Sequence, residues 1–196
     1  KAGKEMSPDE RVKKIAHLKE GYEKIPSQLP NLNIKFVNTD GPKSAVQYQL
    51  RSHLNNLLGI PMQKAVFFDK DGTLVDESGY HEKPQRPPRD EIYFDQTMEG
   101  LRKLQDAGYK LIIISSQPWV KRGKLTEQEV KEIFRSVVSQ YSEKGIQIDD
   151  YYYCLHDRSE ECECKKPNTS LLEKAAEKFN IDTSRSFFVG SAPAAS

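Results

Sequence analysis

The chain has 196 residues, 36% of them hydrophobic, and its Lys and Arg (30) nearly balance its Asp and Glu (29), leaving a formal net charge of +1. This length suffices for one α/β domain plus an extension, and the charge balance argues against a nucleic-acid-binding protein, which usually carries excess basic residues. No apolar stretch approaches the roughly 20 residues that span a bilayer, and the N-terminus lacks the apolar core of a secretory signal, so we expect a cytoplasmic protein with no membrane partner.

Residues 1–62 are predicted to form an α+β extension that is separate from the rest of the chain. Ser7 and Glu10 have the spacing of a capping box, which indicates the start of a helix. Alternating apolar residues predict a short strand at 32–36, and a second helix is predicted over 45–58. The extension carries no recognisable chemical motif, so its role stays open.

Residues 63–196 alternate between short apolar runs and amphipathic segments. Strands are predicted at 65–68, 111–114, 151–153 and 187–189, with helices at 98–108, 126–145 and 171–179. This alternation predicts an α/β fold, a doubly wound parallel sheet with covering helices. Ligands of such sheets bind beyond the carboxyl ends of the strands, which is where a site is expected.

Two carboxylates, Asp69 and Asp71, follow the first predicted strand. They are costly so close together unless positive charge lies between them, and a magnesium ion with a phosphate group would supply it. Asp69 could attack phosphorus and form a phospho-aspartate, while Asp71 could protonate the leaving oxygen and later deprotonate water. A hairpin turn at Asp71-Gly72 is an alternative. The sequence argues against a calcium-binding loop, because such a loop would place Phe67 and Ser78 at positions where carboxylate ligands are required.

All three cysteines lie in one short segment, which is a poor framework for disulfides. Together with one histidine they form a C-x-H pair and a C-x-C pair. The four residues are Cys154, His156, Cys162 and Cys164. Three thiolates and one imidazole match a closed four-coordinate zinc site, and closed coordination indicates a structural role. The alternative is a reduced cysteine cluster without metal.

Further polar residues follow the second and third predicted strands. Ser115 and Ser116 end the second strand, where a hydroxyl could bind a phosphate oxygen, although serine is also common in turns. Lys165 and Lys166 follow the cysteine cluster, and a lysine there could neutralise a phosphate and an aspartate nucleophile. A solvated basic pair is the alternative. The polar segment 77–93 is interpreted as either a cover over the substrate or an ordinary loop.

The order of D-x-D-G-T, a strand-end hydroxyl, lysine-proline and a final V-G strand resembles the haloacid-dehalogenase superfamily. The C-x-H and C-x-C pairs narrow the resemblance to its zinc-containing histidinol-phosphate and heptose-bisphosphate phosphatases, over about residues 64–190. The resemblance implies a Rossmann-like sheet with catalytic Mg²⁺ at Asp69 and Asp71. It also implies Asp69 as nucleophile and Asp71 as acid/base, with Ser115 and Lys166 as the second- and third-motif residues.

One further segment adds to this resemblance, and three features depart from it. The K-R-G segment at Arg122 resembles the heptose enzyme, and 122–125 also resembles the phosphatase half of polynucleotide kinase-phosphatase. Arg122 and Ser116 are therefore predicted to bind substrate, although family members usually carry asparagine at the latter position. They also carry an aspartate, normally a magnesium ligand, where this chain has Ser191. The sequence stops at Ser196, where the family fold would continue, so the domain is expected to be truncated after its fourth-motif strand.

The sequence thus predicts magnesium-dependent hydrolysis of a small phosphate monoester, of histidinol-phosphate or sugar-phosphate type, through a phospho-aspartate. The expected partner is a small phosphorylated metabolite, and no oligomeric state is predicted. A non-catalytic scaffold that keeps the fold and zinc is one alternative, favoured by Ser191 and opposed by the intact Asp69, Asp71 and Lys166. A polynucleotide 3′-phosphatase is the other, favoured by the segment at Arg122 and opposed by the neutral charge and the zinc motif.

Overall fold

The computed structural model describes residues 7–28, 31, 34, 37–40, 43–75 and 95–190. The chain divides into two compact units, Lys1–His53 and Leu54–Ser196. Their boundary falls inside helix α2 (Lys43–Leu58), so the predicted division after residue 62 stays a prediction. In the part of the chain that the structure describes, no helix is long and apolar enough to cross a bilayer.

Helix α1 (Pro8–Gln28) begins where the capping pattern predicts. The Ser7 hydroxyl accepts a hydrogen bond from the backbone N–H of Glu10 at 3.3 Å, and the Glu10 carboxylate accepts one from the backbone N–H of Ser7 at 2.8 Å. These reciprocal bonds satisfy two backbone donors that a helix start leaves free, so the capping box is confirmed. Most of the strand predicted at 32–36 lies outside the described residues.

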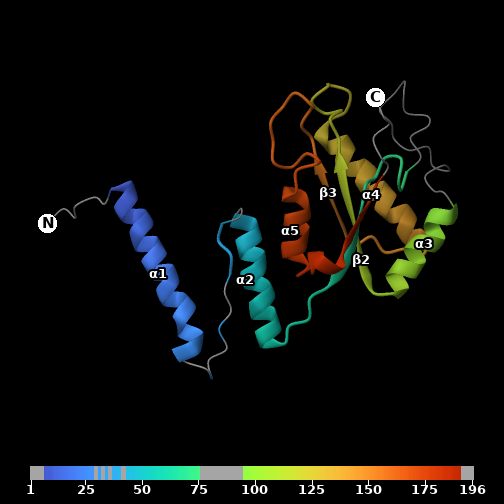
Figure 1. The fold of residues 1–196 in the computed structure, drawn as a ribbon. Coiled ribbons are helices and arrows are strands. Elements are labelled where there is room, and N and C mark those ends of the chain that lie inside the picture. The colour runs from blue at the N-terminus through green and yellow to red at the C-terminus, as the bar shows by residue number, and fades with distance from the viewer. Residues whose placement is uncertain are drawn as a thin grey trace. The chain divides into compact units, whose positions relative to one another are not determined.

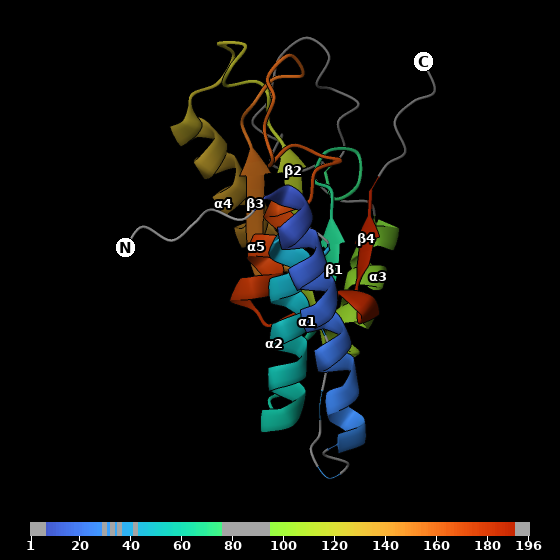
Figure 2. The ribbon, with the colours of Figure 1, turned by 60° about the vertical axis from the view of Figure 1, so that its left-hand side comes forward.

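The second unit contains a sheet of parallel strands in the order β3-β2-β1-β4 (Figure 2). Its strands are β1 (Lys64–Phe68), β2 (Tyr109–Ser116), β3 (Asp150–Cys154) and β4 (Phe187–Val189). The chain runs from β1 through β2 to β3 and then crosses to the other side of β1. The strand order therefore reverses between β1 and β4, and at such a point the loops diverge and leave a crevice beyond the strand ends.

Helices cover both faces of this sheet, as predicted for a doubly wound fold (Figure 1). Helices α3 (Asp95–Asp106) and α4 (Glu127–Glu143) pack on one face, and α5 (Ser170–Lys178) packs on the other. Successive strand residues point to opposite faces. In β1, Val66 and Phe68 accordingly join the core under α3 and α4, while Ala65 and Phe67 join the core under α5.

Helix α4 also fixes the loop that follows β1. It starts with the predicted capping box between Thr126 and Glu129. Near its other end the fully buried Tyr141 donates a hydrogen bond from its hydroxyl to the backbone carbonyl of Leu74 at 2.7 Å. The turn that carries the predicted catalytic aspartates is thereby tied to the core.

Candidate active site

The chain turns sharply just beyond β1, at the predicted aspartates. The backbone N–H of Asp69 donates to the Val189 carbonyl at 2.9 Å, which extends the contact between β1 and β4 by one residue. Gly72 then adopts a φ of +72°, and the N–H of Val75 returns to the carbonyl of Lys70 at 3.0 Å. A side chain at the glycine position would be strained by that φ. The result is a tight loop rather than the hairpin that Asp71-Gly72 alone would permit.

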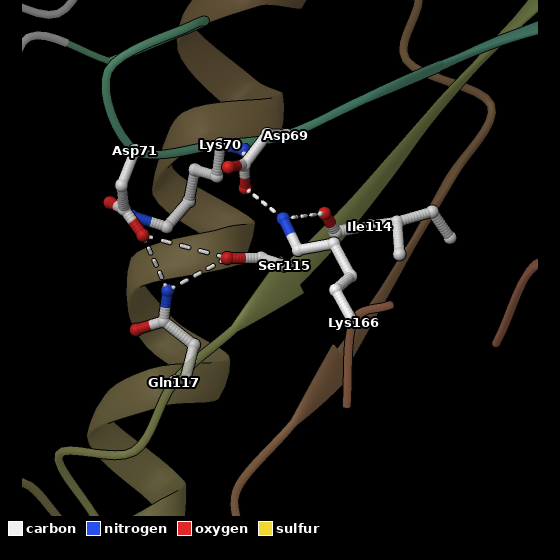
Figure 3. Close-up of polar contacts among 7 residues, drawn as sticks. All are labelled: Asp69, Lys70, Asp71, Ile114, Ser115, Gln117 and Lys166. Carbon is white, nitrogen blue, oxygen red and sulfur yellow. Dashed lines mark hydrogen bonds and ion pairs between the residues drawn. The ribbon is translucent and has the colours of Figure 1, made fainter. Parts of the chain in front are cut away.

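Lys166 reaches the predicted nucleophile. Its Nζ lies 2.7 Å from Oδ1 of Asp69 and 3.4 Å from the carbonyl oxygen of Ile114 at the end of β2 (Figure 3). The same Oδ1 accepts a hydrogen bond from the backbone N–H of Lys70 at 2.8 Å. Two donors on one oxygen fix the orientation of the Asp69 carboxylate.

Asp71 is held by residues that the sequence alone did not single out. The ammonium group of Lys70 pairs with its Oδ1, and the side-chain amide of Gln117 donates to its Oδ2 at 2.8 Å (Figure 3). Ser115 Oγ lies 3.5 Å from the same Oδ2 and 2.9 Å from the Gln117 amide nitrogen. Lys70 and Gln117 are 4% and 3% exposed, so these contacts are shielded from water.

Strand periodicity could have identified Gln117. It stands two residues after Ser115, and residues two apart along an extended strand point to the same face. Lys70 stands between the two aspartates in the sequence, but the sequence-based prediction assigns the neutralising charge to magnesium and phosphate. Lys70 and Lys166 supply two positive charges to the two carboxylates of Asp69 and Asp71.

Gly190 lies against Asp69 at the end of β4. A Cβ on this glycine would stand 3.0 Å from the Phe188 ring and 3.3 Å from Cβ of Asp69, closer than side chains normally pack. The close approach brings the end of β4 to the predicted nucleophile. Ser191, which follows directly, lies outside the described residues.

The four predicted zinc ligands come together beyond β3. Their ligand atoms all lie within 4.8 Å of one another. Cys154 Sγ is 3.7 Å from Cys162 Sγ and 3.1 Å from Cys164 Sγ, and His156 Nδ1 is 3.4 Å and 3.2 Å from the sulfurs of Cys154 and Cys164. Ligands of a tetrahedral zinc ion, with bonds of about 2.0–2.3 Å, stand roughly 3.3–3.8 Å apart. The donor set fits zinc.

Burial also affects the protonation state of this cluster. Desolvation, with a hydrogen bond to Cys164, raises the pKa of the Cys154 thiol to about 12. A thiol in that environment keeps its proton at neutral pH unless a metal ion stabilises the thiolate.

The two residues predicted to bind substrate, Arg122 and Ser116, lie in different surroundings. Arg122 forms two hydrogen bonds with the carboxylate of Asp157, at 2.8 and 2.9 Å, and its guanidinium lies 5.4 Å from the centre of the Trp119 ring. This ion pair holds the pKa of Asp157 well below its usual range. Ser116 lies opposite Cys154 in the sheet register, on the other face of β2 from Ser115. Substrate binding by either residue stays a prediction, and the segment 77–93 lies outside the described residues.

A parallel sheet of this topology, with paired aspartates after its first strand and a lysine returning to them, defines a haloacid-dehalogenase-like phosphatase. The sequence profile of the polynucleotide kinase 3 phosphatase family matches residues 64–195. The chain belongs to this family.

Curated relatives extend the comparison. The chain is 32% identical over 136 residues to D-glycero-beta-D-manno-heptose-1,7-bisphosphate 7-phosphatase of Pasteurella multocida, covering 66% of this chain and 71% of the relative. It is 32% identical over 134 residues to D-glycero-alpha-D-manno-heptose-1,7-bisphosphate 7-phosphatase of Photorhabdus laumondii, covering 65% and 71%.

Two solved structures share the fold. A chain from Mesorhizobium loti, described as a HAD-like (haloacid-dehalogenase-like) phosphatase, aligns with a TM-score of 0.60 at 22% identity, over 67% of this chain and 65% of that one. The D,D-heptose 1.7-bisphosphate phosphatase of B. bronchiseptica, complexed with magnesium and phosphate, aligns with a TM-score of 0.52 at 20% identity, over 61% and 65%. The haloacid-dehalogenase-type fold predicted from the sequence is thereby confirmed.

Proposed function

We propose that this chain hydrolyses a small phosphate monoester of the sugar-phosphate type, with Asp69 as nucleophile and Asp71 as general acid and base. The observation that carries the proposal is the 2.7 Å contact of Lys166 with Asp69 beyond the end of β1, in the loop that also carries Asp71. The naming of the curated relatives as heptose-bisphosphate phosphatases supports the sugar-phosphate class.

The proposed reaction has two steps at phosphorus. In the first, a carboxylate oxygen of Asp69 attacks phosphorus, the bond to the leaving oxygen breaks, and Asp71 gives that oxygen a proton. In the second, Asp71 takes a proton from water as the water oxygen attacks phosphorus, and the bond to Asp69 breaks. Phosphate is released and both aspartates return to their starting states.

Lys166 and Ser115 are proposed to bind the phosphoryl group. The ammonium group beside Asp69 would attract the phosphate and offset the charge that gathers on its oxygens during transfer. Ser115 Oγ accepts a hydrogen bond from Gln117 and donates its own O–H to Asp71 Oδ2 over a long 3.5 Å, so we propose that the O–H turns from this weak contact to a phosphate oxygen when substrate binds.

A magnesium ion fits the same loop, because carboxylate and carbonyl oxygens are the ligands it prefers. Asp69 would contribute its carboxylate and Asp71 its backbone carbonyl. When bound, the ion would offset the charge of the phosphate dianion. Because the charges of Mg²⁺ and a phosphate dianion cancel, an ion and its phosphate would enter together without adding net charge.

Zinc at the cysteine cluster is proposed as a structural clip. Cys164 precedes Lys166 by two residues, so a ligand bond there would restrain the segment from which the lysine reaches Asp69. The closed set of four ligands leaves no position for substrate, which suits a structural role.

The second candidate function is hydrolysis of a 3′-phosphate on a polynucleotide, which the family match favours. The two are separated by assaying phosphate release from a heptose bisphosphate and from a 3′-phosphorylated oligonucleotide under the same conditions. Hydrolysis of the oligonucleotide alone would overturn the sugar-phosphate proposal.

The catalytic proposal itself is tested with Asp69→Asn, which keeps the shape of the side chain and removes the attacking charge. Turnover should fall by roughly 10³-fold or more, since the covalent step is lost. Asp106→Asn, the same change at the end of α3, is the matched control. An Asp69→Asn protein with undiminished turnover, or an unmodified chain without any, would reject the proposal, and the latter result would favour the scaffold alternative.

A further inference from the structure

Gln117 contacts the carboxylate of Asp71, but the proposed reaction gives this glutamine no role. It lies just beyond β2, is 3% exposed, and directs its amide nitrogen at Oδ2 of Asp71, 2.8 Å away. Lys70 pairs with the other oxygen of the same carboxylate. The proposed acid and base is therefore held by Lys70 on one oxygen and by Gln117, with a longer 3.5 Å hydrogen bond from Ser115, on the other (Figure 3).

Hydrogen bonding fixes the orientation of the Gln117 amide. Both of its N–H bonds are directed at partners, one to Asp71 Oδ2 and the other to Ser115 Oγ at 2.9 Å. The reversed orientation would bring the amide oxygen against a carboxylate oxygen. Because the side chain is buried, water cannot replace either hydrogen bond without a cost in free energy.

The backbone of Gln117 is anchored as well. Its N–H donates to the carbonyl of Cys154 at 2.7 Å, which continues the pairing of β2 with β3 one residue past Ser116. Cys154 is 1% exposed and belongs to the proposed zinc cluster. Gln117 thus connects a rigid point at the end of the sheet with the carboxylate of Asp71.

We propose that Gln117 is a positioning residue that aims the proton of Asp71 at the leaving oxygen. The inference rests on the proposed function and adds a specific part to it. An ammonium group and an amide N–H₂ can only donate, so neither Lys70 nor Gln117 can accept the proton of Asp71. Because these donors hold its two oxygens, the carboxyl group of Asp71 cannot rotate freely, and its proton is directed to the substrate.

A positioning role predicts a loss that depends on the leaving group. Phenolate is a poor leaving group and needs a proton as it departs, whereas 4-nitrophenolate departs without one. Since kcat/KM reports the steps up to loss of the leaving group, misplacing Asp71 should slow phenyl phosphate far more than 4-nitrophenyl phosphate. A merely structural role would slow both esters alike.

The test compares Gln117→Leu with the unmodified chain on both esters at saturating magnesium. General acid catalysis typically contributes 10²- to 10⁴-fold, so kcat/KM should fall by about tenfold or more for phenyl phosphate and by less than about threefold for 4-nitrophenyl phosphate. Gln105→Leu is the control, because that glutamine also makes two tertiary hydrogen bonds, to Gly145 and Gln147, away from the site. It should leave the ratio of the two rates unchanged.

Gln117→Asn provides a second variant in case the leucine variant does not fold. It keeps the amide and shortens its reach, so the same selective loss is expected in smaller measure. Equal losses on both esters, or no loss, would overturn the positioning role while leaving the proposed function intact. An unmodified chain that hydrolyses neither of these esters nor a heptose bisphosphate would overturn the proposed function and this inference with it.

Discussion

Lys166 Nζ lies 2.7 Å from Oδ1 of Asp69, so two residues from distant parts of the chain form an ion pair beyond the end of β1. Lys166 follows the cysteine cluster, and Asp69 follows the first strand of the sheet. The pair links the aspartate loop with the segment that carries the proposed zinc clip.

Replacing Lys166 with methionine should abolish most of the activity. The change removes the positive charge beside Asp69 while keeping an unbranched side chain, and loss of one such electrostatic contact typically costs about 10²- to 10³-fold in kcat. Steady-state kinetics on a phosphate monoester would measure the loss. Lys165→Met is the matched control, because the Lys165 ammonium contacts the Asp157 carbonyl instead, at 3.0 Å. Equal losses in the two variants would contradict the role given to Lys166.

Elemental analysis should find one zinc ion for each chain and none in Cys162→Ser. Because metal binding and local folding are coupled, loss of the ion should free the segment between Cys154 and Cys164. Faster trypsin cleavage at Arg158 would report this change, and Ser159→Ala, in the same segment, should cleave at the normal rate. A purified chain without zinc that resists trypsin equally well would contradict the clip.

Ser191→Asp should tighten magnesium and raise turnover. A hydroxyl brings no charge to the ion, and Mg²⁺ exchanges its water reluctantly for neutral ligands, so the unmodified chain should need high magnesium. Titrating magnesium against phosphatase activity in both forms measures the effect, with Ser196→Asp as a control for added charge. Full activity of the unmodified chain at micromolar magnesium would mean that another carboxylate completes the site.

Arg122 forms a bidentate ion pair with Asp157, so substitutions of the two partners can test whether Arg122 binds substrate. If Arg122 binds substrate, Arg122→Leu should raise KM several-fold, whereas Asp157→Asn, which frees the guanidinium, should leave KM unchanged or lower it. If the pair only joins the loop at Trp119 to the zinc segment, both variants should have the same effect. KM measured with a sugar bisphosphate distinguishes these results.

Much of the fold could be predicted from local pattern. The apolar run from Ala65 to Phe68 predicted a strand buried on both faces, and each face of β1 indeed packs into its own core. The spacing of Thr126 and Glu129 predicted the start of α4. These predictions succeed because strand burial and helix capping depend on residues that are neighbours in sequence.

The parts of the candidate site that could be predicted are those in which residues of related chemistry lie close together in the sequence. The paired aspartates predicted a phosphate site beyond β1, and the C-x-H and C-x-C pairs predicted a zinc-binding cluster whose ligand atoms do come together. Both depend on residues that lie within a few positions of each other. Their chemistry could therefore be recognised before the strand order was known.

Only the tertiary structure decided which side chains partner these groups. The contact of Gln117 with Asp71 and the pairing of Arg122 with Asp157 are absent from any local pattern. The contacts of Gln117 and Arg122 each join separate segments, and they exist because β2 lies between β1 and β3 in the sheet. Strand order and register are set by the packing of the whole core, so neighbours across the sheet cannot be assigned from the spacing of residues along the chain.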